Sequence, residues 1–520
     1  MSVPADRGER TDWPDAVAFA DVWQRAVSSR PDQTFLVFEG PDGHVAEWTY
    51  AEFDGTVARA AMAMRRHGVE RGSAVHLALT NSPAFVAAWL AAIRLGAWIV
   101  PSDPAAREPE LAASIRRTAP TLGICSRARA GVYRAAAGDL PIVEVGEADV
   151  DLAPFGTREL GDWPVVDLRD RAAVMFTSGT TGLPKGVEIT QANYAFAGKA
   201  MAEAAALRPC HRQIVVLPMF HANAQYYSFA AAIWTGAEVA LMHTFSASGF
   251  VEQVRRHRAT HASLFAAPMR MILARGITDD TEPVQLENCW YAQNITDDQH
   301  AAVARVFGCA PRQLYGMTET VAAVLTDAAT APVPSSMGFV TPGCEVDLHD
   351  ADGRPVGAGE VGEIVVGGEP GITLFAGYLD MPDVTAQSFR GRWFRTGDRA
   401  RRDDDGRFSF DGRRGDVLKV SGENVSIVEV EAVLAAHPQV LEAAVVGKPD
   451  DVRDEVPVAF VVALDPASPP TIESLREWCE ERLSKAKQPR EFTLLDELPR
   501  TSVGKIRKFL LTTDSGEAQR

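Results

Sequence analysis

The residues most able to do chemistry lie between Ala172 and Val187, in the sequence AAVMFTSGTTGLPKGV. An apolar run typical of a buried strand leads there into glycine, serine and threonine residues and then into Lys185. Glycine lets the backbone approach phosphate oxygens, hydroxyl groups donate hydrogen bonds to them, and lysine supplies a positive charge. The segment therefore predicts a polyphosphate-binding loop rather than a flexible connector. Its predicted binding residues are Thr177, Ser178, Gly179, Thr180, Thr181, Gly182 and Lys185.

Two familiar nucleotide-binding patterns do not apply to this chain. A P-loop has a glycine directly before its lysine, whereas Pro184 precedes Lys185 here. Residues 357–362, GAGEVG, match the G-x-G-x-x-G pattern letter for letter. A dinucleotide fingerprint must follow a strand and open a helix, but this segment follows a turn and leads into a predicted strand. We therefore predict neither a P-loop nor a Rossmann site.

Residues 315–320, YGMTET, form a second polar segment. Tyr315 can stack on a base, Thr318 can bind a phosphate, and Glu319 can hold a hard cation through oxygen. The alternative is an ordinary loop before a helix that Thr318 caps. The segment becomes informative only together with the phosphate loop.

Two further segments are polar and compact. Asp398, in RTGD, suits a ribose because a carboxylate can accept hydrogen bonds from both hydroxyl groups. Arg413 and the segment 419–424, KVSGEN, follow it along the chain. Lys505 lies among threonine, serine and glycine residues in PRTSVGK, which by itself is typical of a solvated basic tail.

These segments must be positioned by elements that alternate along the chain. Apolar spacing predicts helices over 50–70, 83–95 and 107–118, with strands over 74–79, 98–101 and 122–125. The same alternation returns between residues 214 and 265, which predicts a second doubly wound lobe. From about residue 337, short alternating runs with glycine and aspartate turns predict an antiparallel section.

After Gly412 the pattern predicts a compact α+β module. The predicted fold class is therefore α/β. A large N-terminal domain, residues 1–411, has two doubly wound α/β lobes plus a β-barrel-like subdomain. A small mobile α+β C-terminal domain, residues 412–520, carries Lys505.

Composition excludes several classes of function. The 520 residues carry a net charge of −17, which disfavours binding to nucleic acid or to an anionic membrane surface. The most apolar stretch, residues 84–101, contains Arg94, so we predict a buried helix and strand and no membrane insertion. The N-terminus lacks the pattern of a secretory signal, and the 6 cysteines are scattered without C-x-x-C pairs. A cytoplasmic protein is expected.

Taken in order, TSGTTGLPKG, YGMTET, RTGD, GRRGDVLKVSGENV and PRTSVGK resemble the motifs of the adenylate-forming superfamily, over nearly the whole chain. This superfamily contains acyl- and aryl-CoA ligases, the adenylation domains of nonribosomal peptide synthetases and firefly-type luciferases. The resemblance implies that a carboxylate attacks the α-phosphorus of ATP to give acyl-AMP and pyrophosphate, and that a thiol then displaces AMP. It implies ATP, Mg²⁺ and coenzyme A as cofactors or co-substrates.

The resemblance also implies roles for individual residues. The loop 177–185 would hold the β- and γ-phosphates, and Lys505 would be the catalytic lysine that bridges the carboxylate and the α-phosphate. The C-terminal domain would rotate between the two steps, and Gly415 occupies a hinge position where relatives often have a charged residue. The remaining implied contacts are Tyr315 and Gly316 at the adenine, Thr318 at the α-phosphate, Glu319 and Thr177 at Mg²⁺, Asp398 and Arg413 at the ribose, and Gly422 and Glu423 near the thiol tunnel.

Residues 218–225, PMFHANAQ, resemble the motif whose aromatic residue and histidine line the acyl entrance. His221 is therefore a candidate catalytic residue, with a structural histidine as the alternative. The absence of aspartate from residues 220–229 disfavours an amino-acid substrate. The sequence is most similar to the crotonobetaine/carnitine-CoA ligase branch. Residues 290–294, WYAQN, nevertheless predict an unusual pocket floor.

Three functions stay open on the sequence. The favoured one is an acyl-CoA ligase for an apolar carboxylic acid. The second is a freestanding adenylating enzyme that hands its acyl group to an acyl carrier protein or another partner. The third is a non-catalytic nucleotide-binding protein, which Lys505, Glu319 and Asp398 argue against. A homodimer is also left open.

Overall fold

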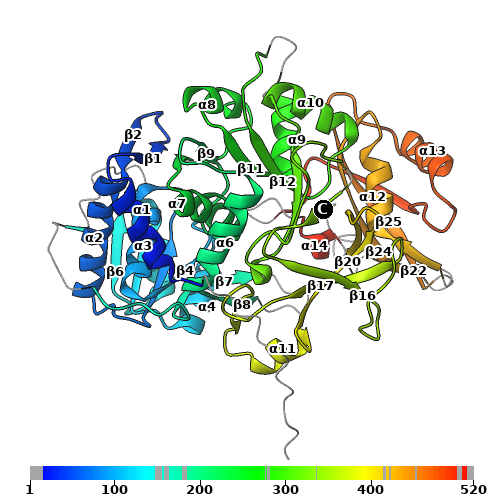
Figure 1. Cartoon of the computed structure of the whole chain (residues 1–520). Helices are drawn as coiled ribbons and strands as arrows, with labels where there is room; N and C mark the ends of the chain where they lie inside the picture. The colour runs from blue at the N-terminus through cyan, green and yellow to red at the C-terminus, as the bar shows by residue number, and fades with distance from the viewer. Residues whose placement is uncertain are drawn as a thin grey trace, which may run out of the picture.

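The computed structural model describes residues 16–146, 155–156, 163–177, 184–275, 277, 281–334, 336–413, 417–420, 423–450, 454–500 and 506–511. Two large sheets with their helices make up most of the chain, a smaller antiparallel sheet lies beside them, and the C-terminal residues form a separate module (Figure 1). The predicted α/β fold class is confirmed.

The first lobe is a seven-stranded sheet in the order β18-β8-β7-β4-β3-β5-β6. Its strands from β3 to β7 run parallel where they pair, and β8 and β18 are antiparallel additions. The strands are β3 (Ala74–Ala78), β4 (Trp98–Pro101), β5 (Leu122–Ser126), β6 (Ile142–Val145), β7 (Arg171–Thr177), β8 (Lys185–Thr190) and β18 (Gly377–Tyr378). The helices between them are α3 (Pro83–Leu95), α4 (Glu108–Thr118) and α5 (Ala130–Ala137).

Helix α3 is the buried helix predicted from the most apolar stretch. Every residue of it except Arg94 is buried, and Arg94 donates to Asp54 at 3.0 Å while its guanidinium lies over the Trp163 ring. Among the described residues, no helix is long and apolar enough to cross a membrane. Gly96 ends α3 with φ +65°, the left-handed conformation that glycine adopts without strain.

The second lobe is a nine-stranded sheet in the order β15-β14-β13-β12-β11-β9-β10-β1-β2. The strands are β1 (Thr34–Glu39), β2 (Val45–Thr49), β9 (Arg212–Val215), β10 (Glu238–Met242), β11 (His261–Phe265), β12 (Asn288–Ala292), β13 (Arg312–Tyr315), β14 (Leu325–Thr326) and β15 (Phe339–Val340). The helices are α1 (Phe19–Ser29), α2 (Tyr50–Arg66), α6 (Gln191–Ala204), α7 (Ala231–Thr235), α8 (Phe250–Arg256), α9 (Ala266–Arg275) and α10 (Asp297–Phe307).

One element of this lobe differs from expectation. The alternation between residues 214 and 265 predicts ordinary helices between strands, but the first of them begins as a π-helix, η3 (Asn223–Ala230), which continues into α7. A π-helix has a wider turn than an α-helix, and the apolar pattern of the sequence does not distinguish the two. Short π-helical segments are frequent at functional sites.

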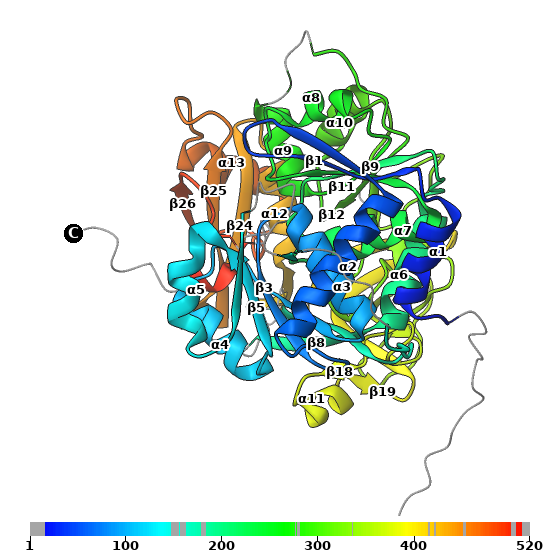
Figure 2. The same ribbon diagram turned by 90° about the vertical axis from the view of Figure 1, so that its left-hand side faces the viewer.

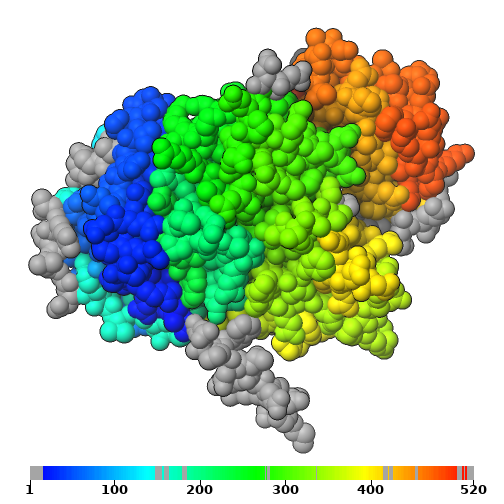
Figure 3. Space-filling model, turned by 45° about the horizontal axis from the view of Figure 1, so that its top comes forward, coloured from blue at the N-terminus to red at the C-terminus, as the bar shows by residue number. Residues whose placement is uncertain are grey.

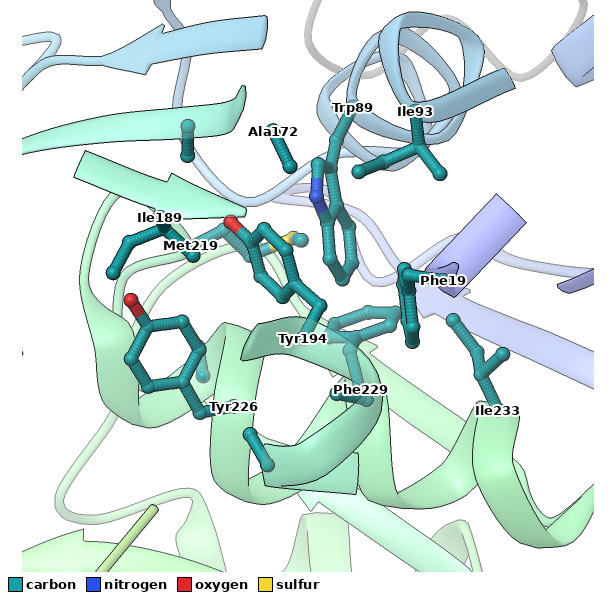
Figure 4. Close-up of a cluster of buried hydrophobic side chains, with 14 of the residues drawn as sticks. Phe19, Trp89, Ile93, Ala172, Ile189, Tyr194, Met219, Tyr226, Phe229 and Ile233 are labelled. Atoms are coloured by element: carbon teal, nitrogen blue, oxygen red, sulfur yellow. The ribbon is translucent and has the colours of Figure 1, made fainter. Parts of the chain in front are cut away.

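The two lobes share one continuous core. Helices α1, α3, α6 and η3 meet between the sheets, where Phe19 stacks on Trp89 and on Tyr194 with ring centroids 5.8 and 5.4 Å apart (Figure 4). Aromatic rings bury large areas of apolar surface in fixed geometries. The lobes are therefore held as one unit (Figure 2).

The predicted antiparallel section is present as a five-stranded sheet. Its order is β16-β17-β20-β19, with β21 on β20. The strands are β16 (Glu345–His349), β17 (Val361–Gly367), β19 (Phe389–Arg390), β20 (Trp393–Arg402) and β21 (Phe408–Arg413). The GAGEVG segment runs into strand β17, as expected for a turn rather than a dinucleotide site.

The C-terminal module has its own hydrophobic core, which includes Val430, Leu434, Val461 and Leu475. It contains β22 (Val417–Val420), β23 (Glu423–Ser426), β24 (Val440–Asp450), β25 (Asp454–Ala463), β26 (Glu491–Leu495), α12 (Ile427–Ala435), α13 (Ile472–Arg482) and α14 (Lys508–Leu511). It occupies one corner of the molecule beside the second lobe (Figure 3). The domain boundary between residues 411 and 412 stays a prediction.

Candidate active site

The carboxyl ends of four neighbouring parallel strands, β9, β11, β12 and β13, lie at one edge of the second lobe. Ligands of open α/β sheets bind beyond this edge. The YGMTET segment begins at Tyr315, the last residue of β13, and continues into a short 3₁₀ turn, Thr318–Thr320. The alternative of a helix capped by Thr318 is wrong, because Thr318 begins the 3₁₀ turn itself and Met317 precedes it as the cap residue.

Glycine is the only residue type that fits at position 316 in this turn. A Cβ atom there would lie 2.8 Å from the Tyr227 hydroxyl and 2.9 Å from the Ala322 carbonyl oxygen. Real Cβ atoms do not approach that closely to backbone in packed interiors. The turn is thus pressed against the π-helix η3, which carries Tyr227.

The turn ends in a strained residue. Val321 has φ +65° and ψ −72°, a region that β-branched residues rarely adopt. Buried Thr320 holds the strain in place, because its hydroxyl accepts from Met317 N at 3.0 Å and contacts the Ala322 carbonyl at 3.1 Å. Strain of this kind persists where the surroundings determine the backbone, and it concentrates at ligand sites.

Three predicted nucleotide contacts meet at Asp398. This carboxylate is 5% exposed; it accepts a hydrogen bond from Tyr315 Oη at 2.7 Å and from Arg413 Nε at 2.6 Å. Asp398 and Arg413 are cross-strand partners on β20 and β21, which fixes the ion pair. Burial and the nearby carboxylate raise the pKa of Tyr315 well above its ordinary value, so the phenol remains a hydrogen-bond donor.

Glu319 and Lys185 both contact Tyr378, a residue that the sequence analysis did not identify. Tyr378 Oη donates to Glu319 Oε1 at 3.0 Å, and the Lys185 ammonium lies 4.8 Å from the centre of the Tyr378 ring. Strand β18, which carries Tyr378, pairs with β8, which begins at Lys185. No local signal marked Tyr378, because its role depends on this pairing.

The ends of the predicted phosphate loop are held together. Thr177, the last residue of β7, is the cross-strand partner of Lys185. Ser178, Gly179, Thr180, Thr181 and Gly182 lie outside the described residues. Lys505, Gly422 and Gly415 also lie outside them, and of Glu423 only the backbone, in β23, is described.

Family comparisons agree with this geometry. The family model described as "AMP-binding enzyme" matches residues 23–379, and the model described as "AMP-binding enzyme C-terminal domain" matches residues 429–505. The chain belongs to the AMP-binding enzyme family. Crotonobetaine/carnitine–CoA ligases are similar: that of Salmonella typhi is 32% identical and that of Proteus mirabilis 31%, each over 94% of this chain and 97% of the relative.

Solved structures of other proteins have the same fold. The anthranilate CoA ligase AuaEII in complex with anthranoyl-AMP is 26% identical with a TM-score of 0.87, covering 97% of this chain and 98% of that chain. The o-succinylbenzoate CoA synthetase MenE from Bacillus subtilis, in complex with its acyl-adenylate OSB-AMP, is 25% identical with a TM-score of 0.84, covering 94% and 97%.

The donor set of this AMP-binding enzyme suits Mg²⁺ that arrives with ATP. Mg²⁺ prefers oxygen ligands and is commonly bound by one or two carboxylates together with substrate phosphates and water. Glu319 offers a buried carboxylate, 4% exposed, and Thr177 offers a hydroxyl at the start of the predicted phosphate loop. No group of three or more His, Cys, Asp or Glu side chains in the described part of the chain could hold a metal by itself.

The predicted acyl-entrance segment follows β9 and leads into η3. Phe220 and His221 have ring centroids 4.4 Å apart. Asn81 holds the segment by accepting from Met219 N at 2.8 Å and donating to the Leu217 carbonyl at 3.0 Å. Asn223, 5% exposed, has no hydrogen-bond partner for either amide atom among the described residues.

Proposed function

We propose that the chain is an AMP-forming acyl-CoA ligase that activates a carboxylic acid with an apolar body. ATP and the acid give acyl-AMP and pyrophosphate, and CoA then displaces AMP to form the thioester. Membership of the AMP-binding enzyme family supports the two-step reaction. The observation that carries the proposal is the Asp398 cluster, which joins Tyr315 and Arg413 where a nucleoside would bind.

The site residues act in adenylation mainly by position and charge. Tyr315 would stack on the adenine, and the carboxylate of Asp398, which holds Tyr315 and Arg413, would also accept hydrogen bonds from the ribose hydroxyl groups. Lys185 and the hydroxyl groups of loop 177–185 neutralise the β- and γ-phosphates. Nucleotidyl transfer needs this neutralisation and an in-line geometry more than it needs a base.

Mg²⁺ would be held by Glu319 and Thr177 and would neutralise charge on the triphosphate. The neutral Tyr378 hydroxyl donates to one oxygen of Glu319 and so orients the carboxylate. Lys505 approaches the reacting carboxylate and the α-phosphate, where negative charge develops in the transition state. His221, beside Phe220, lines the acyl entrance.

The acceptor is CoA, with an acyl carrier protein as the second candidate. The 31–32% identity to CoA ligases along 94% of the chain favours CoA. A cytoplasmic location also belongs to this proposal, because all six cysteines carry free thiols. Gel filtration with light scattering would decide between a monomer and a homodimer.

The proposal is tested by pyrophosphate release against a panel of acids, with and without CoA, and with mass spectrometry of the products. Acyl-CoA from at least one class of acid is expected. Acyl-AMP without thioester would move the assignment to a carrier-protein acceptor. Lys505→Ala should lower adenylation by orders of magnitude while largely sparing CoA transfer to supplied acyl-AMP, and equal loss in both steps would contradict the role of the lysine.

A further inference from the structure

Arg270 lies on α9, five residues after the end of β11. Its helix is on the side of the second lobe that faces the C-terminal module, as both ribbon views show (Figures 1 and 2). The positive charge of Arg270 also acts on Arg500 of the C-terminal module, whose pKa it helps to lower. Arg270 therefore lies at the boundary between the two parts of the chain that form the proposed active site.

Arg270 is partly exposed, and its guanidinium has few hydrogen-bond partners within the described part of the chain. Its Nε atom is buried without a hydrogen-bond partner among the described residues. Its Nη1 atom donates to the Asn294 carbonyl oxygen at 3.4 Å, which is long for such a bond. Within the described part of the chain, no carboxylate forms an ion pair with it.

The same lobe shows how a buried arginine is otherwise accommodated. Arg312 donates to the Asp327 carbonyl oxygen at 2.7 Å and to Asn288 Oδ1 at 2.9 Å, and its guanidinium lies 4.1 Å from the centre of the Trp290 ring. Arg270 has no comparable set of partners among the described residues, so its guanidinium is left able to bind an anionic ligand.

The loop that contacts Arg270, residues 293–294, is held in one conformation by hydrogen bonds. Gln313 Nε2 donates to the Gln293 carbonyl oxygen at 3.0 Å and to Asn294 Oδ1 at 2.9 Å. Gln293 has φ +72°, a conformation that only a well-determined surrounding maintains in a residue other than glycine. Asn294, whose carbonyl oxygen accepts from Arg270, follows β12 and belongs to residues 290–294, the predicted pocket floor.

We propose that Arg270 binds an anionic group that the acid carries in addition to its reacting carboxylate. This inference rests on the proposed function and refines its substrate class to acids with an apolar body and a second carboxylate or similar anion. A planar guanidinium matches a carboxylate through paired hydrogen bonds. The unpartnered amide of Asn223, after the neighbouring strand β9, offers a further polar contact at the same sheet edge.

The test compares matched substrates in pyrophosphate release. Each α,ω-dicarboxylic acid from succinic to sebacic acid, and terephthalic acid, is paired with its monomethyl ester, which keeps one reacting carboxylate and removes the second charge. Wild type, Arg270→Met, Arg270→Lys and the control Arg275→Met are assayed. Arg275 lies on the same helix but is exposed, so the control makes the same chemical change in solvent.

The wild type should prefer at least one diacid over its ester by about 10- to 100-fold in kcat/KM, as expected for a charge-assisted hydrogen bond. Arg270→Met should remove this preference while activity on the ester changes little, Arg270→Lys should keep part of it, and Arg275→Met should keep all of it. Thermal unfolding without substrate should show Arg270→Met about as stable as wild type, because the arginine side chain forms one long hydrogen bond among the described residues.

Three results would overturn the proposal: no diacid preference in the wild type, a preference that survives Arg270→Met, or equal loss on diacid and ester. A rise confined to the KM for CoA would assign Arg270 to a CoA phosphate instead and would also overturn it. Failure of the proposed function would look different, because no acid would then release pyrophosphate in any variant. Calorimetric titration of the diacid and its ester into wild type and Arg270→Met would still test the anion site in that case.

Discussion

Gly316→Ala is the substitution whose effect follows most directly from the structure. The added methyl group would lie 2.8 Å from the Tyr227 hydroxyl, 2.9 Å from the Ala322 carbonyl oxygen and 2.9 Å from the Ala323 Cα atom. Two of these atoms are backbone and Tyr227 is buried, so none can rotate away. The turn that carries Tyr315 and Glu319 must therefore move.

Overpacking of this kind costs about 1–3 kcal/mol. If this free energy is lost from the binding of ATP, because the adenine and Mg²⁺ contacts are displaced, kcat/KM for ATP should fall by roughly 5- to 150-fold. About 1.4 kcal/mol corresponds to a factor of ten. The measurement is ATP–pyrophosphate exchange at saturating acid, with thermal unfolding in parallel. Gly131→Ala is the matched control, because nothing lies within 4 Å of the added methyl group in α5.

The control should keep full exchange activity and gain about 0.4–1 kcal/mol of stability, because alanine loses less backbone entropy than glycine on folding. Adding Tyr227→Phe to Gly316→Ala should restore only part of the activity, because it relieves one of three close contacts. A Gly316→Ala protein with wild-type kcat/KM and wild-type unfolding temperature would refute the steric argument. Lower stability with unchanged kcat/KM would refute the role of the turn in binding ATP.

Three further predictions concern single side chains. Asp398→Asn should raise the KM for ATP by roughly 10- to 100-fold, the loss expected for charge-assisted hydrogen bonds, but should change the KM for 2′,3′-dideoxy-ATP little; equal effects on both nucleotides would contradict the ribose contact. Glu319→Gln should raise the free Mg²⁺ concentration needed for half-maximal pyrophosphate release, and an unchanged Mg²⁺ titration would remove Glu319 from the metal site. Burial lowers the pKa of His261 to about 4 from an ordinary value of 6.5, so its contribution to stability is complete above pH 6.5 and is lost as the pH falls toward 4. By pH 5 the loss should reach about 2 kcal/mol, and urea unfolding at pH 7 and pH 5 should show a smaller difference in His261→Gln than in wild type; an equal difference would contradict the assignment.

Local elements of the fold could be predicted closely from the sequence. The strand over Trp98–Pro101 and the helix over Pro83–Leu95 have the predicted bounds. Each is marked by an apolar run whose ends carry residues such as glycine, proline or serine that favour caps and turns. The α/β class follows because such runs alternate along the chain.

The types of the candidate site residues were also present in the sequence, as in YGMTET and RTGD. Tyr315 and Asp398 are 83 residues apart, and only the pairing of β20 with β21 and the end of β13 brings them to 2.7 Å. The contact of Tyr378 with Glu319, the positive φ of Val321 and the π-helix at Asn223 had no sequence signal.

Local propensity and periodicity act over a few residues, so the sequence by itself determined the class of each element, the order of the motifs and the chemistry available in them. Which side chains meet, and which buried group lacks a partner, depends on the packing of elements distant in the chain. Only the tertiary structure therefore decided that Asp398 meets Tyr315 and Arg413, and that Arg270 Nε is buried without a partner among the residues described.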